Sequence, residues 1–131
     1  AFLEGVALNT RWMLEPFSRF LGHPGGHITA VGGGAQSDVW CQIIADVSGH
    51  PIRQLVNPIQ ANAVGAAFLA SVGIGELGFG DLEKLRHCRR IYEPTSALRN
   101  LYREKFESFK EVRTRLAPLY QRLNSQQWSA T

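Results

Sequence analysis

The chain has 131 residues, of which 44% are hydrophobic and 19% charged, and its formal net charge is +3. This length suits a single compact domain, and the apolar content excludes an intrinsically disordered chain. Thirteen scattered glycines and only two cysteines exclude a collagen-like chain and a disulfide scaffold. No apolar run approaches the roughly 20 residues of a transmembrane helix, so we do not expect a membrane as a partner.

Positive charge gathers in the last third of the chain. Eleven of the fourteen Lys and Arg residues lie between Lys84 and Arg122, where only four acidic residues occur. A basic segment of this kind can bind nucleic acid, but acidic residues three or four positions away on a helix indicate a solvated face. Three pairs have such spacings: Arg103–Glu107, Glu107–Lys110 and Glu111–Arg115. We therefore expect no nucleic acid as a partner.

The two cysteines, Cys41 and Cys88, form no Cys-x-x-Cys pair and are too few for a metal cluster, so we expect no metal site. Free thiols favour a reducing compartment, which predicts a cytoplasmic protein. Trp40 lies on the apolar face of a predicted helix and is expected in the core. Cys41 beside it lacks a histidine or cationic partner in the local sequence, so we do not expect a nucleophile.

The first half of the chain predicts helix, strand and helix. Apolar residues recur at three- and four-residue steps over residues 2–21, which predicts an amphipathic helix that Pro16 should kink or divide. Residues 27–31 are typical of a short, largely buried strand. After a run of glycines, Ser37 is a suitable N-cap for a second helix, and Gly49 is its stop signal.

The second half continues the alternation. We expect a strand over residues 51–56 and a helix of small residues over 60–72, followed by an extended segment at 90–92. A long amphipathic helix follows over 95–125, and Pro118 should bend or break it. This alternation of helices and strands predicts an α/β layer structure.

The stretch from Val31 to Asp38 holds the most chemical information. A buried strand that ends in three glycines and leads into a capped helix places backbone N–H groups at the positive end of a helix. Such a turn binds anions, because glycine lets a phosphate or ribose approach the backbone closely. A glycine-rich turn without any ligand is the alternative.

This turn fits neither of two common nucleotide motifs. No Gly-Lys-Ser/Thr follows it, which excludes a Walker A loop. In the dinucleotide fingerprint, Ser37 would stand where the third glycine belongs, and no acidic residue occurs from Gln54 to Asn57. A dinucleotide-binding domain is therefore disfavoured.

Residues 31–47 closely resemble the adenosine-binding segment of the FGGY carbohydrate kinases, especially the xylulose kinases. They share a Gly-Gly-Gly-Ala-x-Ser turn, a Trp three residues on, and then Gln and Ala-Asp. The resemblance continues through residues 49–52 and 63–70. Residues 1–7 resemble the helix after the family's second signature, and residues 92–94 with the long last helix resemble the family's C-terminal end.

The resemblance implies one domain over residues 1–131, the C-terminal, nucleotide-binding lobe of a two-lobed actin-like ATPase (ribonuclease H-like) fold. Its amphipathic C-terminal helix would span residues 95–125. In the family the catalytic Asp, which acts as general base on the sugar hydroxyl, and the sugar contacts lie upstream of Ala1. We therefore expect a fragment with no catalytic residue, inactive by itself, with an exposed apolar face toward the missing lobe.

The resemblance also assigns roles in the glycine turn. Gly33 and Gly34 would lie against the α-phosphate and ribose of ATP or ADP through their backbone groups. Asp38 would stand where it reaches the adenine edge, and Ala35 and Ser37 would shape the turn. The Mg²⁺ that accompanies the nucleotide would be held mainly by the nucleotide and by the absent part of the enzyme.

Gly65 and Ala66 would let the next helix approach the nucleotide closely. Ordinary roles are the alternatives: Ser37 and Asp38 are common capping residues, and a Gly-Ala-Ala sequence often serves only close helix packing. Gln60 departs from the family, because many relatives have Glu there, so no charged role is assigned to it.

Three functions therefore stay open. The leading one is an ATP-dependent sugar kinase, with D-xylulose as the best single substrate and D-xylulose 5-phosphate as its product. The second is a non-catalytic nucleotide-binding or assembly module, and the third is an NAD-binding dehydrogenase domain. A homodimer is open in each case.

Overall fold

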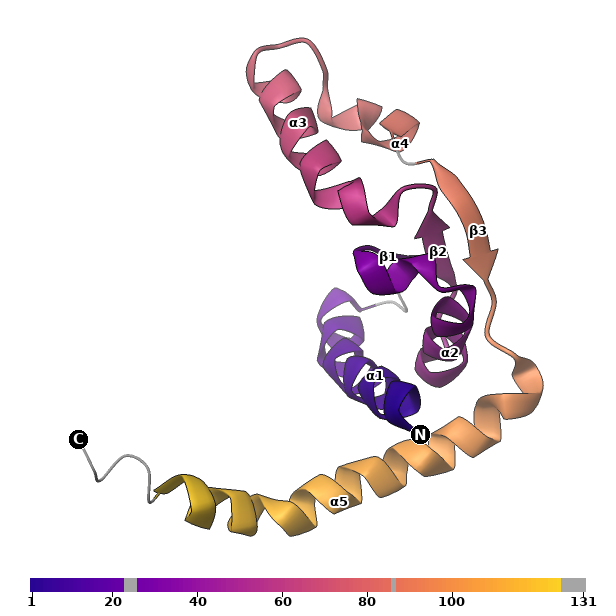
Figure 1. Cartoon of the computed structure of the whole chain (residues 1–131), viewed down its shortest axis with the longest axis vertical. Helices are drawn as coiled ribbons and strands as arrows, with labels where there is room; N and C mark the ends of the chain where they lie inside the picture. The colour runs from indigo at the N-terminus through magenta and orange to yellow at the C-terminus, as the bar shows by residue number, and fades with distance from the viewer. Residues whose placement is uncertain (23–25, 86, 126–131) are drawn as a thin grey trace.

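The computed structural model describes residues 1–22, 26–85 and 87–125. The chain forms a helix-rich α/β structure in which helices and short strands alternate (Figure 1). Its elements are α1 (Phe2–Leu21), β1 (Ile28–Ala30), α2 (Asp38–Ser48), β2 (Ile52–Leu55), α3 (Ala61–Gly73), α4 (Leu82–Leu85), β3 (Cys88–Tyr92) and α5 (Arg99–Ser125). Short 3₁₀ turns precede α2 (η1, Gly33–Gln36), α3 (η2, Pro58–Gln60), α4 (η3, Phe79–Asp81) and α5 (η4, Ser96–Leu98).

This order confirms the predicted α/β alternation and the long last helix. Both internal prolines lie inside continuous helices: Pro16 does not divide α1 and Pro118 does not break α5, so of the predicted alternatives only a kink or bend is left. A proline removes a single helix hydrogen bond, and the bonds of the neighbouring residues continue the helix on both sides.

The three strands form one sheet in the order β1-β2-β3. β1 and β2 are parallel, with Ile28 opposite Ile52, and α2 is the crossover between them. β3 runs antiparallel to β2, with Tyr92 opposite Ile52 and an irregularity between Gln54 and Leu55. β1 is half-buried, not largely buried as predicted, because the described residues place a strand on only one side of it.

Two apolar clusters hold these elements together. The first lies where α1, α2 and α5 meet, and Phe106 of α5 is its largest fully buried side chain. Arg11 of α1 links all three helices, since its Nη1 donates to the carbonyl oxygens of Val47 at 3.0 Å and Tyr102 at 3.3 Å. The second cluster lies between α2 and the sheet and consists of Cys41, Ala45, Ile52 and Tyr92.

Two parts of the chain extend away from these clusters. In Figure 1, α3 and α4 form an arm at one end of the molecule, and the C-terminal half of α5 projects beyond α1 and α2. Much of the apolar stripe on this half of α5 is exposed, at Val112, Leu119, Tyr120 and Leu123. The expected apolar face toward the missing lobe stays a prediction.

Two of the three pairs predicted on the basic helix α5 are ion pairs at its surface, whereas Arg103 and Glu107, both among the described residues, form no ion pair with each other. Lys110 Nζ lies 2.8 Å from Glu107 Oε1, and Arg115 Nη2 lies 2.5 Å from Glu111 Oε1. Across residues 1–22, 26–85 and 87–125, no helix has the length and apolar character needed to cross a bilayer.

Candidate functional site

The glycine turn between β1 and α2 is closed by backbone hydrogen bonds. The N–H of Ala35 donates to the Gly32 carbonyl at 3.2 Å, and that of Ser37 to the Gly34 carbonyl at 3.1 Å. Gly32 itself donates to the Pro58 carbonyl at 2.8 Å, which ties the turn to η2 beyond β2. Gly32 has φ +88° and ψ −176°, a conformation that only glycine adopts readily. The first glycine of the run therefore sets the path of the turn.

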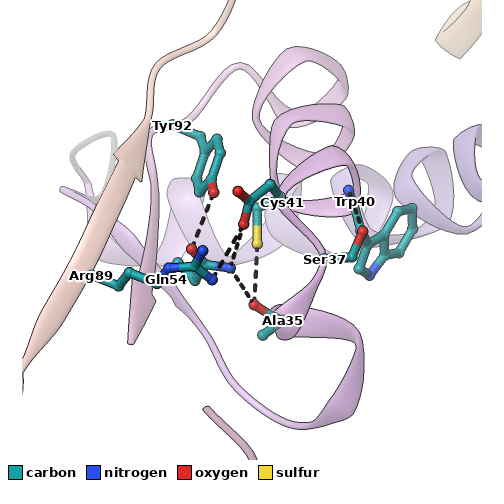
Figure 2. Close-up of polar contacts among 8 residues, drawn as sticks. Ala35, Ser37, Trp40, Cys41, Gln54, Arg89 and Tyr92 are labelled. Carbon is teal, nitrogen blue, oxygen red and sulfur yellow. Dashed lines mark hydrogen bonds and ion pairs between the residues drawn. The ribbon is translucent and has the colours of Figure 1, made fainter. Parts of the chain in front are cut away.

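Ser37 caps α2 as predicted. Its Oγ accepts a hydrogen bond from the backbone N–H of Trp40 at 3.2 Å (Figure 2). At the other end of the helix, Gly49 has φ +74°, the left-handed conformation of a helix stop signal. The positive end of α2 thus lies directly beside the glycines, which is the geometry expected for an anion site.

The two glycines in the middle of the turn have different surroundings. Both Gly33 and Gly34 are exposed, whereas Ala35 is only 4% exposed. A Cβ added at Gly33 would meet no atom within 4 Å, so the backbone there faces open space. A Cβ at Gly34 would lie 3.1 Å from Nε1 of Trp40. The turn therefore presents bare backbone to open space at Gly33 and packs against Trp40 at Gly34.

Beneath the turn lies a buried side-chain amide, that of Gln54 on β2, which is 0% exposed. Its Nε2 donates to the Ala35 carbonyl at 2.8 Å and to Asp38 Oδ1 at 3.2 Å. Its Oε1 accepts from the hydroxyl of Tyr92 on β3 at 3.1 Å. Figure 2 shows these side chains converging from β2, β3 and the turn. The Gln54 side chain therefore connects both β2 and β3 to the turn.

Asp38, the first residue of α2, belongs to this network. Its Oδ1 also lies 3.5 Å from Nη1 of Arg89. The hydrogen bond from Gln54, then that from Tyr92 and the charge of Arg89, hold the pKa of the Asp38 carboxyl below its usual value. Burial, together with the nearby Asp38 carboxylate, raises the pKa of the Tyr92 hydroxyl. At neutral pH the network therefore contains one carboxylate and a neutral phenol.

Cys41 contacts the turn from inside α2. Its thiol is fully buried and donates to the Ala35 carbonyl with an S–O distance of 3.6 Å. Burial first, and then the Asp38 charge, raise the pKa of this thiol. A protonated, buried thiol is a poor nucleophile.

The two small residues predicted on α3 lie apart from the glycine turn. Gly65 lines a cavity of about 580 Å³ at the carboxyl ends of β1 and β2, whose other walls include Val31, Val56 and Asn57. Ala66 is exposed and is not among the residues that line this cavity, and neither are Gly33, Gly34, Ala35, Ser37 and Asp38. The structure thus brings five of the seven predicted residues together in one turn and places Gly65 at a neighbouring hollow.

The residue that sequence reasoning missed is Gln54. In the sequence, Gln54 stands out only as part of a segment that has no acidic residue. One signal was available: Gln54 lies two residues after Ile52, so on a strand both side chains point to the same, inward face. A polar residue at an inward strand position predicts a specific hydrogen-bond partner.

The donor set fits a nucleotide phosphate better than a metal ion held by protein alone. The turn offers backbone amides and open space at Gly33. In the part of the chain that the structure describes, no three or more His, Cys, Asp or Glu side chains group as metal ligands do. A Mg²⁺ ion would thus need ligands from the nucleotide itself.

Comparison with known proteins finds a family of carbohydrate kinases and individual kinases that are similar to this chain. Residues 1–74 match the C-terminal domain of the FGGY family of carbohydrate kinases. An autoinducer-2 kinase of Yersinia enterocolitica is 33% identical over 116 residues, which are 87% of this chain and 22% of that protein. The autoinducer-2 kinase of Yersinia pestis is 32% identical over the same length. The chain therefore spans about a fifth of the length of these relatives.

Solved structures of xylulose kinases are also similar to this chain. The xylulose kinase of Rhodospirillum rubrum has a TM-score of 0.76 and 34% identity over 92% of this chain and 25% of its own. A xylulose kinase of Lactobacillus acidophilus has a TM-score of 0.78 at 23% identity over 92% of this chain and 24% of its own, and so shows likeness of fold alone. These likenesses confirm the expected fold, the C-terminal part of an actin-like ATPase with a long last helix. The chain belongs to the FGGY family of carbohydrate kinases and carries the family's C-terminal domain.

Proposed function

We propose that this chain forms the adenosine-binding wall of an ATP-dependent sugar kinase. The observation that supports this best is the turn η1, which presents the bare backbone of Gly33 and Gly34 at the amino end of α2, in a chain of a carbohydrate kinase family. Each exposed contact of an anion with a helix end is worth about 0.3–1 kcal/mol, so the turn is one wall of a site and not the whole of it.

The roles of the turn residues follow from this proposal. The backbone of Gly33 and Gly34 lies against the α-phosphate and ribose of the nucleotide, while Ala35 and Ser37 keep the shape of the turn. Asp38 reaches the adenine edge. Its side chain is 48% exposed although Oδ1 contacts Gln54 and Arg89, so an acceptor remains accessible from outside. Adenine would thus meet a carboxylate already fixed in position.

Gly65 and Ala66 add no large side chain of their own to α3 on the side proposed to approach the nucleotide. A Cβ at Gly65 would meet no atom within 4 Å, so the cavity beside it has room for part of a ligand. ATP, with its Mg²⁺, supplies the phosphoryl group when bound. The residues of this chain bind and orient the nucleotide.

We further propose that the general base and the sugar contacts belong to the remaining four fifths of such a kinase. This chain alone would then not phosphorylate a sugar. The Rhodospirillum neighbour and the Gly-Gly-Gly-Ala-x-Ser-x-x-Trp pattern favour D-xylulose as the substrate, although the relatives also include autoinducer-2 and gluconate kinases. A cytoplasmic location suits ATP as the donor.

A non-catalytic assembly module is the second candidate. The exposed apolar residues on the outer half of α5, such as Leu119 and Leu123, favour it because they form a surface that a partner or a second copy could cover. The third alternative, an NAD-binding domain, gains no support from the family match.

An NMR titration of the chain with Mg-ADP tests the proposal, with NAD as the control ligand. Saturable shifts of the amides from Gly32 to Asp38 with Mg-ADP alone would support the adenosine wall. Equal or stronger shifts with NAD would overturn the kinase function. No shift with either ligand would contradict nucleotide binding by this chain.

A further inference from the structure

We infer that Gln54 is the positioning residue of the nucleotide-binding turn: its buried amide holds the Ala35 carbonyl and the Asp38 carboxylate at the places from which the turn binds nucleotide. This inference rests on the proposed function. It adds a residue on β2 that lies outside the glycine motif.

Both polar atoms of the Gln54 side-chain amide, Nε2 and Oε1, have hydrogen-bond partners. A glutamine side chain has two N–H donors on Nε2 and an acceptor on Oε1. Here Nε2 donates to Ala35 and Asp38, and Oε1 accepts from Tyr92. Because the side chain is 0% exposed, water cannot replace these partners. The amide therefore has a single favourable orientation.

The turn needs such support because its own side chains supply little. Gly33 and Gly34 have none, and Gln36 is exposed. Ala35 is the buried residue of η1, and its carbonyl accepts from Gln54 Nε2 at 2.8 Å and from the thiol of Cys41 at 3.6 Å. The shorter and better donor is the amide, so Gln54 is the main side-chain anchor of the turn.

The same amide connects the turn to the first residue of α2. Gln54 Nε2 lies 3.2 Å from Asp38 Oδ1, which Arg89 of β3 also approaches. Tyr92, on the same strand as Arg89, fixes the far end of the amide. Strands β2 and β3 therefore set the position of the carboxylate proposed to meet adenine.

A purely structural role would give different results, because loss of Gln54 would then weaken the whole fold evenly. Three variants separate the two roles. Gln54→Met keeps the length and removes the hydrogen bonds. Tyr92→Phe removes the hydroxyl that donates to Oε1 and that also acts on Asp38, and it leaves both donors of the Gln54 amide in place. Ile52→Val is the control, since Ile52 is also 0% exposed on the same face of β2 but belongs to the apolar cluster below the turn.

The experiment measures Mg-ADP affinity and amide hydrogen exchange by NMR, with the free energy of unfolding from denaturant titration. We expect Gln54→Met to weaken Mg-ADP binding by roughly tenfold or more, the cost of unsatisfied buried groups. Exchange at the Ala35 and Ser37 amides should accelerate more than exchange in α1. Tyr92→Phe should act in the same direction with a smaller effect, and it serves as the test if Gln54→Met does not fold.

The inference is overturned if Gln54→Met binds Mg-ADP within about twofold of the unmodified chain. It is also overturned if Ile52→Val weakens binding as much at equal loss of stability. If the unmodified chain binds no Mg-ADP, the proposed function fails, and Gln54 is judged by exchange alone: selective acceleration in the turn supports its positioning role, and even acceleration contradicts it.

The Gln54→Glu variant provides a further measurement, the pH dependence of its Mg-ADP affinity relative to the unmodified chain. A purely structural role of Gln54 would not change this ratio with pH. The carboxylate of the variant would face the Ala35 carbonyl and the Asp38 carboxylate, both acceptors, whereas its protonated form regains a donor. The other titratable and charged groups around it are Cys41 of α2 and Arg89, Arg90 and Tyr92 of β3. Mg-ADP affinity of Gln54→Glu, relative to the unmodified chain at each pH, should recover as the pH falls from about 8 to about 5. A ratio that stays flat across this range would contradict the inference.

Discussion

Gly34 and Trp40 lie so close across the first turn of α2 that a Cβ on the glycine would be 3.1 Å from Nε1 and 3.2 Å from Cδ1 of the indole. The neighbouring Gly33 has no such contact, since a Cβ there would meet nothing within 4 Å. Two adjacent glycines are therefore needed for different reasons. At Gly34 the protein occupies the space beside the backbone, whereas at Gly33 the space is free for a ligand.

Gly33→Ala should keep the stability of the chain and weaken Mg-ADP binding by about tenfold, because its methyl group enters the space proposed for the phosphate. Gly34→Val should abolish binding and also displace Trp40, which changes the indole N–H resonance. NMR titration and denaturant unfolding of both variants check this. Unchanged Mg-ADP affinity in Gly33→Ala would contradict the site.

Gly32→Ala should destabilise the chain by about 1–3 kcal/mol, because φ +88° with ψ −176° is strained for any residue with a Cβ. Gly5→Ala is the matched control with the opposite sign. Gly5 lies inside α1 and has open space at its Cβ position, so alanine there should stabilise by about 0.5–1 kcal/mol. Urea unfolding of both variants measures the difference. Equal effects of the two changes would show that the turn does not require glycine at Gly32.

Phe106→Ala should cost about 3–5 kcal/mol, because this ring is only 1% exposed at the meeting point of α1, α2 and α5. Val112→Ala, on the same helix but 54% exposed, should change stability by no more than about 0.5 kcal/mol. Chemical denaturation monitored by circular dichroism gives both values. A large cost at Val112 would reveal a partner for the outer half of α5, for example in a self-associated form.

Glu4 should make stability depend on pH in the acid range. Its Oε1 lies 2.8 Å from Nζ of Lys105, and Oε2 lies 3.3 Å from the amino terminus of Ala1. The hydrogen bond from Lys105 first, and then that from the amino terminus, lower the pKa of Glu4 from 4.5 to about 2. Its contribution to stability is therefore complete above pH 4.5 and is lost as the pH falls toward about 2.

Glu4→Gln should remove that part of the acid transition and lower the denaturation midpoint at neutral pH. The control is Glu76→Gln, at an exposed site after α3, which removes one carboxylate without touching the contact between α1 and α5. Midpoints measured across the acid range separate the two. A Glu4→Gln profile that still matches the unmodified chain would show that the Glu4–Lys105 pair does not link α1 to α5 in solution.

Local signals predicted the caps and helices well because they depend on near neighbours. Ser37 caps α2 through the amide of a residue three positions on, and Gly49 ends the same helix by its own conformation. For Pro16 and Pro118 the sequence left two alternatives, a bent helix or a broken one, and both helices are continuous. The sequence shows where a helix hydrogen bond is lost, but whether the helix continues depends on the bonds around it.

Burial was harder to predict, because it depends on distant parts of the chain. The apolar stripe of α5 has the same spacing before and after Phe109, yet only Tyr102 and Phe106 in it are buried, where α1 and α2 lie against the helix. Trp40 packs against the first apolar cluster but is half-buried, and one edge of its ring lies beside Gly34. The role of Gln54 was hidden for the same reason, since its partners lie 16 to 38 positions away in sequence.

The side chain of Gln54 on β2 also affects which strand register the folding chain can adopt. Arg53 and Leu55 occupy the face of β2 opposite Ile52 and Gln54. If β2 paired with its neighbours one residue out of step during folding, every side chain would change faces. A guanidinium would then face the apolar cluster beneath α2, and Gln54 would lose its partners on the turn and on β3. A slip of one residue would therefore remove the contacts of the binding turn together with those of the sheet, so the register of β2 and the shape of the turn depend on each other.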